Sequence, residues 1–200
     1  EPMAMDNLLP PDRQAVTYAF TWQAALLRPQ YERLFPNRVR PSGRSSFIVN
    51  LEAGDWAWFR QHGWALEVHC GDEVQALQVP FLFNTNLLPT NFHCRTPPTT
   101  YVWRARWSGP PTDMELAFSG SIRIEGGGLA IQKDGFEQNL PFTVPADSDL
   151  TITLTIPPEA PPTAILYERG PGGLRVSDWE KFTPLTAPVE PAPAPLAPPA

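Results

Sequence analysis

Residues 151–156 read Thr-Ile-Thr-Leu-Thr-Ile, and this alternation indicates the fold class most directly. Side chains on a strand point to opposite faces in turn, so the threonines share one face and the aliphatic residues share the other. β-Branched residues fit a pleated surface that is buried on one side. The segment therefore predicts a strand with a polar outer face and an apolar face toward a core.

The same period of two recurs on both sides of this segment. Large apolar side chains alternate with small or polar ones in residues 16–22, 46–51, 64–70, 101–107 and 116–124. In residues 101–107 the aromatic side chains share one face, which we expect to be core, and two arginines share the other. Most of the chain is therefore predicted to form short strands.

Turn residues connect these strands into predicted hairpins. A turn at 71–73 makes residues 64–83 one hairpin. Three glycines at 126–128 can supply positive φ, so that residues 129–132 pair back on the preceding strand. A last turn in 170–173 joins the strands of residues 165–176.

The predicted fold is an all-β antiparallel sandwich of immunoglobulin-like or jelly-roll type, because short strands follow one another at close spacing and helix signals are few. We assign residues 1–11 to an N-terminal arm and residues 12–184 to the sandwich. Residues 164–184 have a second interpretation as an appended hairpin. Residues 185–200 are rich in Pro and Ala, which favours an extended tail.

Composition excludes several classes of protein. The formal net charge is −6, so the chain lacks the basic field with which nucleic-acid binders displace counterions. Its apolar runs fall far short of the roughly 20 residues that span a bilayer. We therefore expect neither nucleic-acid binding nor a membrane span.

Two His-Cys dipeptides, His69-Cys70 and His93-Cys94, leave three interpretations open. Two histidines and two cysteines are a tetrahedral zinc set, but neighbouring residues on a strand point apart, which makes this metal site unlikely. The two cysteines can instead form a disulfide, or they can be unlinked thiols with Cys70 buried as a small hydrophobic side chain.

Seven tryptophans make aromatic stacking a second candidate activity. Trp56 and Trp58 flank one residue beside a predicted loop, with Asp55 and Arg60 next to them. Indole faces stack on sugar rings, so exposed rings here would form a glycan-binding platform. The alternative is that both rings fill the core.

Arginines supply a candidate interface. They cluster in residues 28–44 and recur on the face opposite the aromatic side chains of residues 101–107. Guanidinium groups bind carboxylates and phosphates, and the acidic remainder of the chain favours a protein partner. The candidates are Arg28, Arg33, Arg38, Arg40, Arg44, Arg104 and Arg106; the alternative is a solvated connection.

Sequence motifs of enzymes are missing. The chain contains no Gly-x-Ser-x-Gly elbow, no phosphate-binding glycine loop, no zinc-binding His-Glu-x-x-His and no dinucleotide fingerprint. We therefore predict a protein without catalytic residues and without a cofactor.

The stretch from Ser121 to Leu129, continued through residues 151–156, resembles the β-domains of virion proteins of tailed bacteriophages, such as decoration, tail-tip or fibre components. The resemblance rests on threonine-faced strands joined by glycine turns. It implies self-assembly, contact with a host surface and a place in the virion.

Three functions follow as hypotheses. The first is a non-enzymatic structural protein that assembles with copies of itself or with other structural proteins. The second is a carbohydrate-binding module that uses Trp56 and Trp58 on surface glycans. The third is a small hydrolase, because a site can be built on any fold from residues distant in sequence.

Overall fold

The computed structural model describes residues 16–20, 28–29, 31–33, 35–42, 46–52, 54–55, 63–79, 81–85, 93–170, 173–176 and 181–185. Within these ranges helical residues are limited to 28–29, 31–33 and 54–55. The predicted all-β, antiparallel class is confirmed. The predicted N-terminal arm and nearly all of the predicted tail lie outside the described residues.

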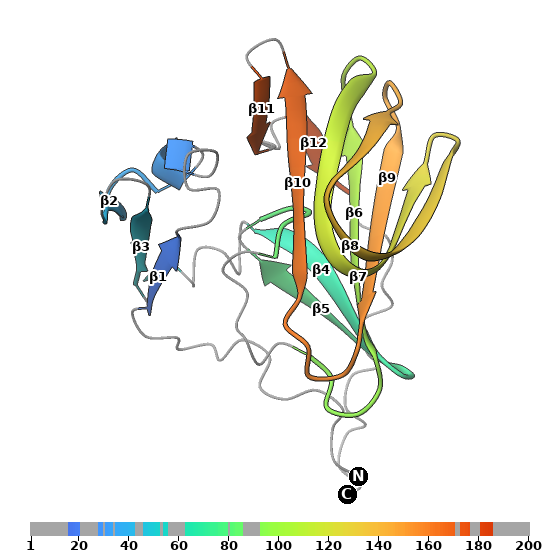
Figure 1. The fold of residues 1–200 in the computed structure, drawn as a ribbon, viewed down its shortest axis with the longest axis horizontal. Coiled ribbons are helices and arrows are strands. Elements are labelled where there is room, and N and C mark those ends of the chain that lie inside the picture. Colours follow the sequence, from blue (N-terminus) through green and yellow to red (C-terminus); the bar gives the residue numbers. More distant parts are fainter. Residues whose placement is uncertain are drawn as a thin grey trace, which may run out of the picture.

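Twelve strands make up the described fold (Figure 1). They are β1 (Val16–Phe20), β2 (Val39–Pro41), β3 (Phe47–Leu51), β4 (Trp64–Cys70), β5 (Glu73–Val79), β6 (Thr99–Trp107), β7 (Thr112–Gly126), β8 (Leu129–Val144), β9 (Asp149–Ile156), β10 (Thr163–Gly170), β11 (Gly173–Val176) and β12 (Phe182–Pro184).

A small sheet of the order β1-β3-β2 stands beside a large sheet of the order β11-β10-β7-β9-β6-β4-β5. In the large sheet, β8 pairs with β7 and β12 pairs with β6. Aromatic side chains connect the two sheets: the ring of Tyr31, which lies between β1 and β2, stacks on that of Phe81, which follows β5, with centroids 5.1 Å apart. Tyr31 also meets Phe47 of β3 edge to face.

The strand β7 divides the large sheet into two layers. It pairs with β8 along its whole length, but its other neighbour changes from β10 at residues 114–119 to β9 at residues 121–125. The change falls at Gly120, which lies opposite Gly135 of β8. Both glycines have positive φ, 128° and 119°, so the two strands change direction together (Figure 1).

One hydrophobic core fills the space between these elements. It takes Met114, Leu116 and Phe118 from the first half of β7 and Ile122 and Ile124 from the second half. The aromatic face predicted for residues 101–107 is buried here as well, and so are the aliphatic residues of 152–156. Alternation therefore predicted correctly which side of these strands is inside.

Several predicted boundaries differ from the structure. The hairpin of residues 64–83 ends at Val79, before Phe83, whose φ of 51° is incompatible with a strand. The strand predicted at 129–132 continues to Val144. Strand β10 pairs with β7 over Thr163–Glu168, which makes the last hairpin an integral part of the large sheet.

No helix in the described ranges is long and apolar enough to cross a membrane.

Candidate functional site: the open edge of strand β8

Strand β8 has a long edge that no described residue covers. It pairs with β7 alone, over Leu129–Val144, and its 16 residues far exceed the 7 of β5 and the 4 of β11, which also end the sheet. An open edge presents a row of unpaired backbone N–H and C=O groups, which is a template for pairing with another chain.

The hairpin turn determines which backbone groups face this edge. Gly127 and Gly128 form a two-residue turn with φ of 60° and 94°, and the residues that flank such a turn are a hydrogen-bonded pair. Since hydrogen-bonded pairs alternate along an antiparallel ladder, Leu129, Ile131, Lys133 and Gly135 point their backbone groups at β7. The groups pointing outward belong to Ala130, Gln132, Asp134 and Phe136.

The second half of β8 is protected against such pairing. The register shifts between Leu116 and Phe118 of β7, which indicates a bulge in β8 before Leu140. Beyond it Pro141 lies opposite Glu115, at a position whose N–H would point outward. Proline and bulges are two devices that block a sheet edge. The segment open to a partner is therefore residues 129–137, which we call the β8 open segment.

Phe136 lies within this open segment and is 64% exposed. It is the one large hydrophobic side chain of the described residues that is exposed to this degree. Its neighbours are charged: Nζ of Lys133 lies 3.2 Å from Oε1 of Glu137, and Asp134 Oδ1 accepts a hydrogen bond of 2.6 Å from Ser121. The open segment thus combines free backbone groups with one apolar and several charged side chains.

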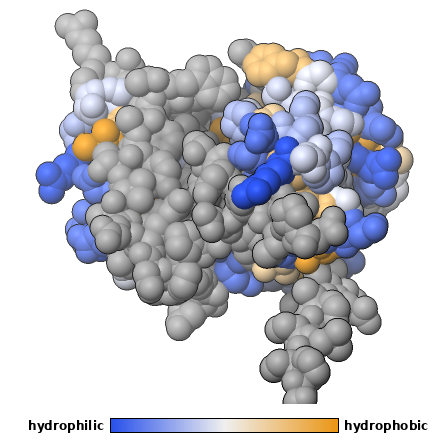
Figure 2. All heavy atoms as spheres, turned by 90° about the horizontal axis from the view of Figure 1, so that it is seen from below, coloured by the Kyte–Doolittle hydropathy of each residue, from blue (hydrophilic) through white to orange (hydrophobic). Residues whose placement is uncertain are grey.

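One face of the molecule is mostly polar among its described residues (Figure 2). Figure 2 shows one face on which hydrophilic residues predominate among those described, with hydrophobic atoms in small separate groups. Scattered hydrophobic groups are ordinary on a monomer surface.

A polar cluster on the first half of β7 is the other candidate. Glu115 is 93% buried by residue area, being 7% exposed, and its Oε1 accepts a 2.7 Å hydrogen bond from Asn139. Its Oε2 accepts from Nε of Arg169 at 2.6 Å. A shallow pocket of about 390 Å³ lies beside this pair and includes Asp113 and Thr143. Both oxygens of Glu115 are occupied by internal partners, so the cluster is explained by structure alone.

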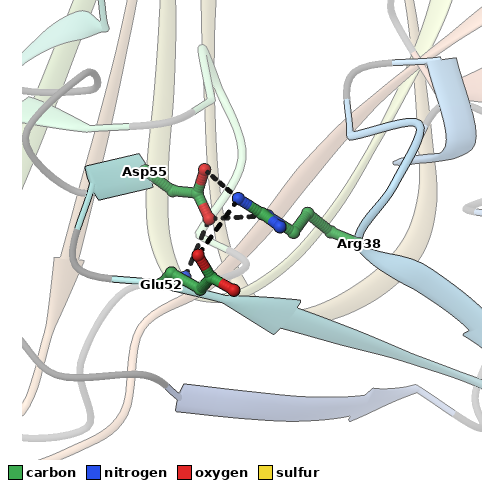
Figure 3. Close-up of polar contacts among 3 residues, drawn as sticks. All are labelled: Arg38, Glu52 and Asp55. Atoms are coloured by element: carbon green, nitrogen blue, oxygen red, sulfur yellow. Dashed lines mark hydrogen bonds and ion pairs between the residues drawn. The ribbon is translucent and has the colours of Figure 1, made fainter.

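The predicted glycan platform falls mainly outside the described residues, since these do not include Trp56, Trp58 or Arg60. Asp55 is described, and its carboxylate is held by Arg38 at 2.9 and 3.3 Å (Figure 3). The backbone N–H of Glu52 donates to the same carboxylate. The hydrogen bonds that Arg38 donates to Asp55 raise the pKa of its guanidinium further above the ordinary value.

The predicted arginine interface consists largely of internal ion pairs. Arg28 pairs with Glu32 one helical turn away at 3.0 Å, and Arg38 pairs with Asp55 and Glu52. Arg33 and Arg40 are exposed, and Arg44 lies outside the described residues. Of the described arginines in residues 28–44, Arg28 and Arg38 are thus neutralised by acids of the same chain.

The two arginines of β6 also meet acids. Arg104 contacts the carboxylate of Glu67, a residue of β4 that is only 8% exposed, and Arg106 pairs with Asp149 at 2.9 Å. The same Glu67 carboxylate lies 3.0 Å from Nε2 of His69. Partial burial lowers the pKa of His69 below its ordinary value.

Cys70 and Cys94 form a disulfide, with Cα atoms 5.6 Å apart. It ties the end of β4 to the segment that precedes β6. Neither sulfur is then available as a thiolate ligand. Nδ1 of His93 lies 3.2 Å from the carbonyl oxygen of Cys94. In the described ranges no group of three His, Cys, Asp or Glu side chains is placed to hold a metal ion.

Sequence reasoning missed the β8 open segment. Alternation is clear at Leu129 and Ile131 and again at Phe142 and Val144, but the polar and glycine residues between them hide the continuity. The signal that could have revealed it is the pair of glycines at 120 and 135. They lie equally far from the Gly127-Gly128 turn, as a bent hairpin requires.

No family model matches this chain, and no curated protein sequence matches it. Among the solved structures with a distant likeness to this chain are two anti-sigma factor proteins. An anti-sigma factor domain-containing protein from Clostridium clariflavum has a TM-score of 0.43 at 10% identity, over 62% of this chain and 47% of that chain. A second anti-sigma factor domain-containing protein has a TM-score of 0.47 at 12% identity, over 64% and 50%. The chain thus spans about half the length of these proteins, and the likeness is too distant to bear on function.

Proposed function

We propose that this chain is a non-enzymatic structural protein that assembles with copies of itself through the β8 open segment. The observation that carries the proposal is the long edge of β8, which no described residue covers and on which Phe136 stands exposed. β-Strand addition to such an edge gains backbone hydrogen bonds, and the exposed ring supplies an apolar contact.

The contrast between the two halves of β8 supports this proposal. The second half carries Pro141 and the bulge, whereas residues 129–137 carry neither. Lys133 is a residue that often guards edges, but its charge is already paired with Glu137. A chain that avoided edge pairing altogether would be expected to protect both halves alike.

The finer setting, a component of a tailed-bacteriophage virion, remains the prediction of the sequence resemblance. The carbohydrate-binding alternative depends on Trp56 and Trp58, outside the described residues. The hydrolase alternative would need titratable groups free to react, but both oxygens of the pocket residue Glu115 have internal partners. Assembly is the function with a structural feature in its support.

Two substitutions test the proposal by light scattering after gel filtration of the full chain. Phe136→Ala removes the exposed ring, and Val74→Ala is its control on β5, which also ends the large sheet. Asp134→Pro removes an outward N–H but leaves the backbone hydrogen bonds to β7 in place. Asp134→Ala is its control, because both substitutions remove the side-chain hydrogen bond from Ser121 of β7. We expect a concentration-dependent oligomer for the wild type and both controls, and a monomer for Phe136→Ala and Asp134→Pro. A wild-type monomer at every concentration would overturn the proposal.

A further inference from the structure

We infer that the second copy pairs with β8 in antiparallel fashion about a twofold axis at Gly135, so that Lys133 of each copy lies opposite Glu137 of the other. This inference rests on the proposed function and specifies its partner and register. A twofold interface uses the same surface on both copies, and each contact therefore occurs twice.

Backbone geometry allows this register. A twofold axis between two antiparallel strands, perpendicular to the sheet, sets residues opposite each other when they are equally far from the axis. With the axis at Gly135, Asp134 of one copy faces Phe136 of the other, and both have outward backbone groups. Each of these two pairs can exchange two hydrogen bonds, while Lys133 and Glu137 fall at the closer, non-hydrogen-bonded positions.

Charged side chains favour the axis at Gly135 over an axis at either neighbouring residue. An axis at Asp134 would set that carboxylate against its own copy and Lys133 against glycine. An axis at Phe136 would set Lys133 against Asn139. The axis at Gly135 is the one of these three that places opposite charges face to face, and it does so twice. Opposite charges directly across a strand pair are favourable, and like charges are unfavourable.

Phe136 gains a partner in the same arrangement. Since Phe136 faces Asp134 of the second copy, the two Phe136 rings become diagonal neighbours across the axis. Diagonal neighbours lie about 7–8 Å apart, within reach of aromatic side chains. The ring that is 64% exposed in one copy is then covered by its symmetry mate.

Gly135 suits the position on the axis. A Cβ built on it meets no atom within 4 Å, so the space around it is open in the single copy. In the pair, two residues at position 135 face each other at the closer spacing. Two glycines bring no side chains to this point, and the flanking charged side chains can approach each other.

The ion pair between Lys133 and Glu137 within each copy does not prevent these residues from pairing with the second copy. Lys133 and Glu137 side chains are 47% and 36% exposed, and a pair in such contact with water contributes little to stability. Each lysine can therefore leave its own glutamate for that of the second copy at small cost. The two charges are paired before and after association.

A mixing experiment separates contacts between copies from those within a copy. Lys133→Glu gives a chain with acids at 133 and 137, and Glu137→Lys gives a chain with lysines at both. Each variant alone sets like charges across the axis and should be monomeric. An equimolar mixture sets unlike charges across it, so we expect native mass spectrometry and light scattering to show a heterodimer.

The control is a mixture of Arg40→Glu with Asp72→Lys, which shifts the net charges of the two chains by the same amounts at sites remote from β8. Those two variants should each behave like the wild type and should show no preference for the mixed dimer. If Lys133 and Glu137 act only within one copy, mixing will not restore association, because each chain still carries a like-charged pair.

The two sets of variants test assembly through the β8 open segment separately from the register with its axis at Gly135. A wild-type oligomer that Phe136→Ala disrupts, with no heterodimer on mixing, would overturn the register at Gly135 and leave assembly through the β8 open segment standing. A wild-type monomer would overturn both. A heterodimer confined to the Lys133→Glu and Glu137→Lys mixture supports both.

Discussion

Glu115 shows how one buried charge is accommodated in this fold. Its side chain is 9% exposed, and its oxygens are shared between Arg169 of β10 and Asn139 of β8. Both Nε and Nη2 of the guanidinium contact Oε2, and Oε1 is left to accept the hydrogen bond from Asn139. These three residues are far apart in the sequence, so no local pattern could have predicted that they meet.

Arg169→Ala should therefore lower the free energy of unfolding by about 1–2 kcal/mol, because it leaves the buried carboxylate with Asn139 alone. The value is below that of a fully buried pair because the Arg169 side chain is 53% exposed and screened by water. Arg106→Ala is the matched control, since it removes a pair in which both partners are largely exposed. Urea denaturation measures both. Equal losses for the two variants would show that burial of Glu115 does not matter.

The strands β7 and β8 show what a sequence reveals about an element and what it hides. Period two located β7 and the start of β8, because alternation reports which side of a strand is buried. It could not reveal the neighbours of β7, which change from β10 to β9 at Gly120. That change depends on contacts between segments far apart in the chain. The length of β8 was hidden by Lys133, Asp134 and Gly135, which carry no apolar alternation.

The bend at Gly120 and Gly135 allows a paired prediction. A Cβ at Gly120 would lie 2.7 Å from Cγ2 of Ile156 and 2.8 Å from the backbone oxygen of Thr155. A Cβ at Gly135 would meet nothing within 4 Å, so only the strain of positive φ remains. We expect Gly120→Ala to cost about 3 kcal/mol or more and Gly135→Ala about 1–2 kcal/mol in the free energy of unfolding. Similar costs in urea denaturation would mean that packing against β9 does not fix the bend.

At the scale of the whole molecule, the class of fold was predictable, but the surface that we propose for assembly was not. Alternating residues and glycine turns suffice for an all-β fold, because burial of one strand face imposes that pattern. Several arginines of the predicted interface form ion pairs within the chain, such as Arg38 with Asp55. The sequence could not show these pairs, because folding brings the acids to the arginines. The β8 open segment emerges only when the complete sheet shows which edge remains uncovered.

Amide hydrogen exchange, resolved by residue and followed as the protein concentration rises, tests this account most directly. The amides of Asp134 and Phe136 point to the open edge and should exchange quickly in the dilute chain but slowly in the oligomer. The amides of Lys133 and Gly135 point to β7 and should be slow throughout, which makes them an internal control. If the mass in solution rises while Asp134 and Phe136 keep exchanging quickly, the copies associate through another surface and the central claim is wrong.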